Sequence, residues 1–260
     1  MRIALGQLAS GTDTAANLRV IDAYAARAAA GGAQLVAFPE YATYEKKMID
    51  ATFPTAAQPL DGPVGTELAG IAARYGIALV AGMVESSPDP GRAFNTLAAF
   101  SANGALLAAY RKVHLFDAQG FRESDFVAPA PSTEPVVFDV DGVRFGLMTC
   151  YDLRFPEQAR GLSDAGSQVL LVCSSWVPGE LKTAQWRTLL AARAIENSLY
   201  VAGVCQAPPV SVGNTLLAGP MGDVLAELGT RPGVLASEVS QPAISQVREH
   251  FPTHRQRRIR

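Results

Sequence analysis

Short apolar runs alternate with segments of helical periodicity along most of this chain, and this alternation is the feature that most restricts its fold. Residues 3–8, 33–38 and 77–83 have the length and apolar character of buried strands. Residues 14–30 and 64–75 separate them, place apolar side chains on one helical face and stop at glycine. Strands that alternate with helices in this way predict an α/β domain with crossover connections.

Two hairpins and a long irregular segment interrupt the crossover pattern. The first hairpin joins residues 94–100 to 105–110 through an Asn-Gly pair, and the second joins residues 136–140 to 143–149. Many charges and prolines over residues 112–134 predict a long loop between the two hairpins. The remaining elements are expected to be a helix to about residue 162, a strand at 168–173, a long helix at 179–197 and a β-rich C-terminal part.

The chain is long and apolar enough for one large domain. It has 260 residues, of which 48% are hydrophobic, and neither an internal repeat nor a low-complexity linker divides it. We therefore expect a single domain over residues 1–260. The sequence lacks an apolar run of about 18 residues, so no membrane span is expected. Residues 1–8 form too short an apolar run for a signal peptide, so a cytoplasmic protein is expected.

Charge and cysteine content argue against several classes of function. A net charge of −2 and a pI near 5.9 disfavour nucleic-acid binding through overall charge. The basic residues 255–260 are more simply explained as a solvated or partner-contacting end. Cys150, Cys173 and Cys205 are odd in number and widely spaced, which argues against a disulfide framework and against a zinc site. Cys173 and Cys205 end apolar strand-like runs and are expected to be core residues.

Cys150 stands at the predicted end of a strand, where a nucleophile could be presented. An apolar run ends at this residue, and Pro156 and Glu157 suit the first turn of a helix just beyond it. A helix N-terminus close to a thiol favours the thiolate. The histidines of the chain are His114, His250 and His254. Two of them lie in the C-terminal tail and the third shares a segment with Lys112, so a carboxylate is expected to be the base if Cys150 is a nucleophile.

Polar, reactive side chains follow three separate apolar strands. Glu40 comes after one predicted strand, Lys112 after another and Cys150 after a third. Ligand sites of α/β sheets gather at the C-terminal ends of strands, so these three side chains are expected to converge. Taken singly, each has an ordinary explanation: a glutamate there is usually a cap or a surface charge, a lysine is usually solvated and a cysteine is usually a core residue. The combination is what points to chemistry.

Three segments resemble the signature motifs of the nitrilase, or carbon–nitrogen hydrolase, superfamily. They cover residues 38–40, 110–117 and 150–157, and the likeness extends from the strand at residues 3–8 to the turn around residues 220–222. The resemblance implies a four-layer αββα sandwich. Two subunits of such proteins commonly pair to extend it to αββααββα, so a homodimer or a higher homo-oligomer is expected.

The resemblance also implies a catalytic Glu-Lys-Cys triad, here Glu40, Lys112 and Cys150, and a second glutamate, here Glu123. Glu40 would act as general base, and the thiolate of Cys150 would attack an amide carbonyl. Lys112 and the backbone N–H of Tyr151 would stabilise the resulting oxyanion. Glu123 would orient Lys112 or hold the amine side of the substrate, unless it forms only an ion pair with a neighbouring cation. Neither a metal nor an organic cofactor is needed for this chemistry.

The residues around Cys150 favour one branch of the superfamily. The run from Cys150 to Glu157 resembles the amidases that include ω-amidase and deaminated-glutathione amidase, whereas nitrilases usually carry Cys-Trp-Glu. Residues 175–194 also resemble deaminated-glutathione amidases, although Gln185 stands where these usually have histidine. The C-terminal third departs further, with a short, proline-rich loop at residues 206–212. These departures leave the substrate open.

Three residues are candidates for holding the substrate. Trp176 lies just past a predicted strand end, where a pocket is expected. Lys182 and Arg154 could meet a substrate carboxylate, and arginine can do so bidentately. Arg154 is at least as well suited to a structural pairing with Asp152 or Glu157.

The leading hypothesis is a cysteine-dependent amidase. It would hydrolyse a small carboxylate-bearing ω-amide, such as deaminated glutathione or an α-keto ω-amide, to an acid and ammonia through a thioester acyl-enzyme. A nitrilase or an N-carbamoyl hydrolase on the same triad is the first alternative. A non-catalytic binding protein of the family is weaker, because it would not need four reactive residues together. A redox-sensing thiol protein is weaker still, because no resolving cysteine lies near Cys150 in the sequence.

Overall fold

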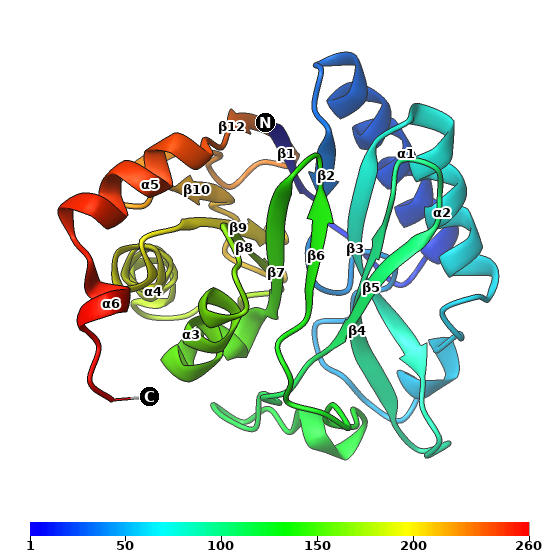
Figure 1. Ribbon diagram of the computed structural model, residues 1–260. Coiled ribbons are helices and arrows are strands. Elements are labelled where there is room, and N and C mark those ends of the chain that lie inside the picture. The colour runs from blue at the N-terminus through cyan, green and yellow to red at the C-terminus, as the bar shows by residue number, and fades with distance from the viewer. Residues whose placement is uncertain (260) are drawn as a thin grey trace.

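The computed structural model describes residues 1–259, which form two six-stranded sheets packed face to face between layers of helices (Figure 1). The strands of the first sheet are β1 (Arg2–Gln7), β2 (Leu35–Ala37), β3 (Ala78–Ser86), β4 (Ala93–Phe100), β5 (Leu106–Arg111) and β12 (Gly233–Glu238). Those of the second are β6 (Val137–Val140), β7 (Val143–Thr149), β8 (Val169–Ser174), β9 (Tyr200–Cys205), β10 (Leu216–Ala218) and β11 (Val224–Glu227). Their spatial orders are β12-β1-β2-β3-β4-β5 and β11-β10-β9-β8-β7-β6.

The two sheets repeat one arrangement although the sequence contains no detectable repeat. In the first sheet β1, β2 and β3 are parallel, and antiparallel strands flank them. In the second sheet β7, β8 and β9 are parallel and are flanked in the same way. The crossover helices are α1 (Thr14–Ala30), α2 (Pro63–Tyr75), α3 (Pro156–Asp164) and α4 (Lys182–Asn197). Each helix connects two parallel strands, as an alternating strand–helix pattern requires.

Three layers of apolar contact hold the sandwich together. Leu5, Leu97 and Leu147 belong to the cluster between the two sheets. A second cluster packs α1 and α2 against the outer face of the first sheet, and a third packs α3 and α4 against the second sheet. Because the central strands are covered on both faces, their sequences read as continuous apolar runs. The predicted four-layer αββα sandwich is confirmed, and Figure 1 shows α1 and α2 on one side and α3 and α4 on the other.

The predicted elements differ from the observed ones mainly near the C-terminus. The hairpins are where they were predicted, and the long helix begins at Lys182 rather than at residue 179. The β-rich C-terminal part ends in two helices that the sequence analysis missed, α5 (Gln241–His250) and α6 (Thr253–Gln256). Their apolar pattern is too sparse to recognise, because Ile244 is the one buried residue of α5 and α6 has none. They lie beside α4 (Figure 1), and Nε2 of His254 donates a hydrogen bond to the carbonyl oxygen of Asn197 at 2.9 Å.

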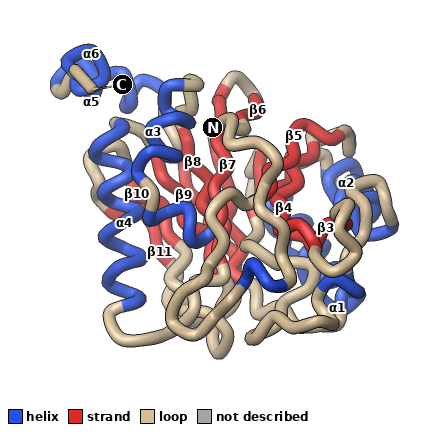
Figure 2. The backbone as a smooth tube through the Cα atoms, turned by 90° about the horizontal axis from the view of Figure 1, so that it is seen from below, coloured by secondary structure: helices blue, strands red, loops and turns tan. Residues whose placement is uncertain are grey.

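Loops gather at the end of the sheets where several strands finish, as Figure 2 shows from below. Three short 3₁₀ turns lie among the loops and strand ends: η1 (Pro54–Ala56), η2 (Glu123–Asp125) and η3 (Cys150–Arg154). The long segment predicted as a loop therefore contains one short turn, which carries Glu123. In residues 1–259 none of the helices has the length and apolarity needed to cross a membrane.

Candidate active site

Glu40, Lys112 and Cys150 meet in one cavity although they come from both sheets. Glu40 follows β2 and Lys112 follows β5 in the first sheet, whereas Cys150 follows β7 in the second. All three line one cavity, and Glu123 lines it with them. The expected convergence of strand ends is therefore present in the structure.

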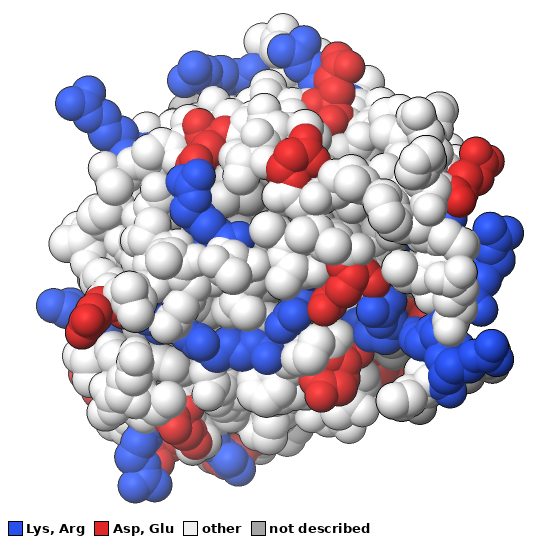
Figure 3. Space-filling model, turned by 90° about the vertical axis from the view of Figure 1, so that its left-hand side faces the viewer, with Lys and Arg blue, Asp and Glu red and all other residues white. Residues whose placement is uncertain are grey.

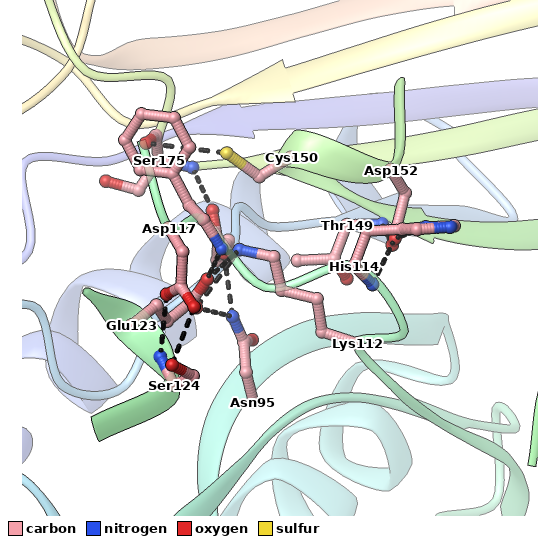
Figure 4. A network of polar contacts seen from close by, with 12 residues as sticks. Asn95, Lys112, His114, Asp117, Glu123, Ser124, Thr149, Cys150, Asp152 and Ser175 are labelled. Atoms are coloured by element: carbon pink, nitrogen blue, oxygen red, sulfur yellow. Dashed lines mark hydrogen bonds and ion pairs between the residues drawn. The ribbon is translucent and has the colours of Figure 1, made fainter. Parts of the chain in front are cut away.

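The ammonium of Lys112 lies between two buried carboxylates. Its Nζ donates hydrogen bonds to Oε1 of Glu40 at 2.9 Å and to both carboxylate oxygens of Glu123 at 2.9 and 3.1 Å. The side chains of Glu40, Lys112 and Glu123 are only 1%, 2% and 5% exposed. Figure 4 shows Lys112 pointing toward Glu123, with Asn95 alongside. Breaking such a desolvated pair leaves an uncompensated buried charge, so the three groups constrain one another.

Further donors hold the two carboxylates in place. Asn95 donates to Glu40 at 2.7 Å, and the backbone N–H of Ser175 donates to the other Glu40 oxygen at 2.6 Å. The hydroxyl of Tyr41 and the backbone N–H of Phe116 donate to Glu123 at 2.8 and 2.6 Å. Hydrogen bonds of this kind fix the orientation of a carboxylate.

Lys112 keeps its proton in this site. Burial by itself would lower the pKa of Lys112, but the carboxylates of Glu123 and Glu40 outweigh burial and raise the pKa well above its usual value. The side chain is therefore an ammonium at neutral pH. It can stabilise a negative charge, and it cannot serve as a general base.

The chain turns sharply at Cys150, and Asp152 holds this turn. Cys150 has a φ of +47°, an uncommon conformation for a residue with a β-carbon. Asp152 is fully buried and accepts hydrogen bonds from the backbone N–H of Thr149 at 3.0 Å and from the hydroxyl of Tyr110 at 2.6 Å. It also contacts the backbone N–H and Nδ1 of His114 at 3.0 and 2.8 Å. Asp152 thereby ties the cysteine turn to the segment that carries Lys112 (Figure 4).

Two other contacts fix the positions of the turn and of Glu40. Arg193, on α4, donates two hydrogen bonds to the carbonyl of Leu153, at 3.1 and 2.7 Å. Gly82, on β3, passes so close to the loop after β2 that an added β-carbon would lie 2.7 Å from the Cα of Glu40 and 2.5 Å from the nitrogen of Tyr41. Only glycine allows such a close contact between the two backbones. The contact fixes the backbone position from which the Glu40 side chain extends.

The thiol of Cys150 is protonated in the resting protein. Burial raises the pKa of Cys150 well above its usual value, and the charge of Glu40 raises it further. The helix N-terminus predicted next to Cys150 was expected to favour the thiolate, and this expectation was wrong. The turn η3 is a single short 3₁₀ segment, so its dipole is small beside the cost of burying an anion. The Sγ atom lies 3.7 Å from the carbonyl oxygen of Ser175.

The three candidate substrate-binding residues lie together beside the cavity. The guanidinium of Arg154 lies 4.9 Å and the ammonium of Lys182 4.7 Å from the centroid of the Trp176 ring. Arg154 donates to Oε1 of Gln185 at 2.6 Å, so the suggested pairing with Asp152 or Glu157 was wrong. None of the three lines the cavity, but the Lys182 ammonium lies 5.2 Å from the ring of Phe116, which does. Tyr151 is the second residue of η3, where a backbone N–H has no partner within the helix.

Lys182 is a buried lysine without an acidic partner in the part of the chain that the structure describes. It is 3% exposed, and no Asp or Glu oxygen lies within 4.0 Å of its ammonium among residues 1–259. Burial lowers the pKa of Lys182, and a negative charge on Cys150 would oppose this. Lys182 is therefore close enough to the cysteine to interact with it electrostatically.

The mouth of the cavity carries a second group of cations. Residues 45–49, which include Lys46 and Lys47, line the cavity, and Arg122 lines it from the segment between β5 and β6. Lys46 is paired with Asp50 at 2.6 Å, and Arg122 contacts Asp125 at 3.3 Å. Within the described residues Lys47 has no ion-pair partner. The sequence analysis did not single out these cations, because charged residues in a loop are usually solvated.

The other histidines and cysteines have structural places. His114 stacks on Phe155 at 3.7 Å and contacts Asp152, so it is not positioned as a base for Cys150. Cys173 and Cys205 are fully buried, as predicted, and all cysteines of the chain are unpaired. No group of three or more His, Cys, Asp or Glu in residues 1–259 is arranged to hold a metal ion.

Sequence reasoning missed five residues that shape this site: Tyr41, Glu45, Asn95, Asp152 and Ser175. Asn95 had a detectable signal, since it is a polar residue inside an otherwise apolar strand. Tyr41 has a φ of 55° directly after Glu40, and only the structure shows this. The contacts of Ser175 with Glu40 and Cys150 bridge 135 and 25 positions of sequence, and no local pattern encodes them.

Comparison with known proteins identifies the family. Residues 2–249 match the carbon–nitrogen hydrolase family. The chain belongs to the carbon–nitrogen hydrolase family. It is 42% identical over 267 residues to a hydrolase of Mycobacterium tuberculosis, covering 96% of this chain and 93% of that one. It is 32% identical over 269 residues to the omega-amidase of Homo sapiens, covering 99% and 95%. A carbon–nitrogen hydrolase acts on carbon–nitrogen bonds other than peptide bonds.

A solved structure extends this comparison to the fold. A cysteine-to-alanine mutant of an amidase from Nesterenkonia sp. AN1 has a TM-score of 0.83 and 31% identity, and the match covers 98% of this chain and 96% of that one. This amidase is assigned to the nitrilase superfamily, in agreement with the αββα sandwich of this carbon–nitrogen hydrolase. The similarity to two amidases supports amidase activity for this member of the family.

Proposed function

We propose that this protein is a cysteine-dependent amidase that hydrolyses a small carboxylate-bearing ω-amide to an acid and ammonia. The observation that carries the proposal is the buried Glu40–Lys112–Glu123 ion network, which shares one cavity with Cys150. Such a network costs desolvation free energy and is hard to explain as a stabilising device, because a buried ion pair is often no more stable than apolar packing. A nucleophile, a base and a fixed cation in one cavity suit acyl transfer.

The proposed reaction begins with proton transfer from the Cys150 thiol to Glu40 as the substrate binds. The sulfur attacks the amide carbon, and the carbonyl oxygen becomes an oxyanion that the Lys112 ammonium and the Tyr151 N–H stabilise. The carbon–nitrogen bond then breaks, the nitrogen takes the proton from Glu40, and ammonia leaves a thioester on Cys150. Glu40 next takes a proton from water, the water attacks the thioester, and the acid leaves as the thiol is restored.

The protonation states fit this sequence of events. Burial raises the pKa of Cys150 and the charge of Glu40 raises it further, so an adjacent base is required to generate the thiolate, and Glu40 can take this role. Glu40 is held by Asn95, Ser175 and Lys112, which leaves it oriented rather than free. Glu123 accepts hydrogen bonds from the same ammonium through both of its oxygens, and we assign to Glu123 the positioning of Lys112.

The related amidase from Nesterenkonia sp. AN1 supports a cysteine nucleophile. In a glutamate-to-glutamine mutant of that protein, the acetamide moiety of fluoroacetamide is covalently attached to the active-site cysteine. That structure is 31% identical to this chain, with a TM-score of 0.82. We infer that Cys150 is the corresponding nucleophile.

Two groups of cations support an acid-bearing substrate. Lys182 lies near Cys150 without an acidic partner, so it suits the carboxylate of a short ω-amide. Lys47 and Arg122 lie at the mouth, so they suit the carboxylate of a longer molecule such as deaminated glutathione. The inner part of the cavity already holds the carboxylates of Glu40 and Glu123. A substrate acid is therefore repelled from the reacting end, and the amide enters first.

Ammonia release from a panel of amides tests the proposal. The panel contains α-ketoglutaramate, succinamate, deaminated glutathione, glutamine and propionamide. We expect turnover of at least one acid-bearing amide and slower turnover of propionamide. Lys182→Met is expected to raise KM for the two short acids roughly 10- to 100-fold, the cost of losing a hydrogen bond to a charged group. A Lys47→Ala/Arg122→Ala variant is expected to raise KM roughly 3- to 10-fold for deaminated glutathione only, since exposed ion pairs are weak.

Propionamide is the internal control, because it lacks a carboxylate and should not respond to either variant. If a well-folded wild-type protein releases no ammonia from any member, the ω-amidase proposal fails. The alternatives are then hydrolysis of nitriles, hydrolysis of N-carbamoyl compounds, which releases carbon dioxide together with ammonia, or a binding function without catalysis.

We also propose that residues 1–260 form one domain that pairs with a second copy through the α3–α4 layer. Leu181, directly before α4, and Ile195, near the C-terminal end of α4, are 66% and 56% exposed, and an interface that covered them would remove apolar surface from water. Figure 3 shows the side on which α4 to α6 lie, where charged side chains are separated by broad uncharged areas. Sedimentation equilibrium is expected to give twice the 27.4 kDa mass of one chain, and a monomer at micromolar concentration would contradict this.

A further inference from the structure

Glu45 is a buried carboxyl group that the proposed mechanism does not use. It lies in the loop after β2 and is 4% exposed, and its backbone N–H donates to the carbonyl of Gly11 at 3.0 Å. Its side chain lines the same cavity as Glu40, Lys112 and Cys150.

One oxygen of Glu45 has no hydrogen-bond partner. Oε2 is buried and unpaired, and it is the only carboxylate oxygen of residues 1–259 in this condition. The buried carboxylates of Glu40, Glu123 and Glu85 each accept hydrogen bonds from two or more side chains or backbone groups. An unpaired buried polar atom costs about 1–3 kcal/mol, so such an atom in a ligand cavity calls for a partner that the protein itself does not supply.

The charges around Glu45 determine its protonation. Glu40 and Glu123 carry two negative charges against one positive charge on Lys112, so the inner cavity is already negative. A third carboxylate would have no cation of its own. Burial raises the pKa of Glu45 well above its usual value, and the charge of Glu40 raises it further. Burial and the neighbouring carboxylate therefore favour the neutral form of Glu45, and a neutral carboxyl group can donate a hydrogen bond.

We propose that Glu45 contacts the substrate of this amidase and donates a hydrogen bond to an uncharged carbonyl oxygen in the acyl part of the molecule. The inference rests on the proposed function and assigns a residue to one substrate class within it, the α-keto ω-amides, whose acyl chain carries a keto oxygen in addition to the reacting amide. An ammonium group at this position would find no carboxylate to pair with. Glu45 is thus a specificity residue that favours keto amides over amino amides.

The test compares α-ketoglutaramate with glutaramate, which has the same chain but lacks the keto oxygen. In the wild-type protein kcat/KM is expected to be higher for the keto compound. Glu45→Met removes the donor and is expected to reduce this ratio roughly 10-fold, the value of one hydrogen bond of about 1.4 kcal/mol. Glu45→Gln keeps a neutral donor and is expected to retain most of the ratio. If Glu45 had only a structural role, the substitution would lower kcat/KM for both substrates by the same factor and leave their ratio unchanged.

Controls separate the possible failures. Glu67→Gln changes an exposed carboxylate on α2, outside the cavity, and should leave the ratio at its wild-type value. Thermal unfolding shows whether each variant is folded. An unchanged ratio in a folded, active Glu45→Met protein overturns the role of Glu45 and leaves the amidase intact. A Glu45→Gln protein that loses glutamine turnover while keeping the keto substrate would show that Glu45 acts as a carboxylate, which also overturns the proposal. No turnover of either compound by the wild type is a failure of the proposed function instead.

Discussion

Replacement of Cys150 by alanine is expected to lower kcat/KM for every substrate by roughly 10⁴-fold or more, because no other group in the cavity can form the acyl-enzyme. The substitution removes one sulfur atom and keeps the β-carbon, so the temperature of unfolding should change little. Ammonia release at substrate concentrations below KM measures the loss. Mass spectrometry of quenched wild-type enzyme should show a thioester adduct, and the variant should show none.

Cys173→Ala is the matched control for this variant. Cys173 is also fully buried, but it lies in the cluster between the two sheets. Its replacement should cost about 1 kcal/mol of stability as a small cavity forms, and kcat should stay near the wild-type value. Retention of more than a tenth of the activity by Cys150→Ala would rule out the cysteine mechanism and favour direct attack by water.

Replacement of Lys112 by methionine is expected to damage stability and catalysis together. The change leaves Glu40 and Glu123 buried without their shared cation, which should lower the free energy of unfolding by about 3–5 kcal/mol. Loss of an oxyanion donor should lower kcat by roughly 10²- to 10³-fold in the protein that remains folded. Urea unfolding and ammonia release measure the two effects separately.

The contribution of Lys112 to the free energy of unfolding depends on pH in a definite direction. The pKa of Lys112 is raised in the folded protein, so its contribution is complete below the usual pKa of lysine, about 10.4. The contribution is lost only as the pH rises through the raised value. In wild-type protein, stability from this group should therefore be constant between pH 6 and 8. In the variant, one of the two carboxylates must take up a proton to be tolerated, so stability should rise as the pH falls.

A double variant separates the two roles of Lys112. Lys112→Met/Glu123→Gln removes one of the two negative charges and should restore part of the stability without restoring kcat. Arg144→Met removes an exposed partner of Asp139 and should cost less than about 1 kcal/mol. If Lys112→Met cost no more than Arg144→Met, the buried ion network would not be the constraint that its geometry indicates.

The sequence by itself determined the class of fold and the three reactive strand ends. Apolar runs such as residues 168–173 read as strands because both faces of a central strand are covered, and the helices between them have regular apolar faces. Glu40, Lys112 and Cys150 stood out because each is a reactive polar residue that follows an apolar, strand-like run, and strand ends are where ligand sites of α/β sheets gather. These are local properties of the chain, and local patterns are what a single sequence records.

Only the tertiary structure decided how the reactive groups are held and charged. The contacts of Lys112 with Glu40 and of Ser175 with Glu40 join positions 72 and 135 residues apart. The close approach at Gly82, the turn held by Asp152 and the unpaired oxygen of Glu45 likewise depend on segments that meet only when both sheets are packed. The protonation of Cys150 was mispredicted for the same reason. The sequence showed a helix N-terminus, which favours a thiolate, but burial and the neighbouring carboxylate raise the pKa of Cys150. Both of these influences arise from tertiary packing.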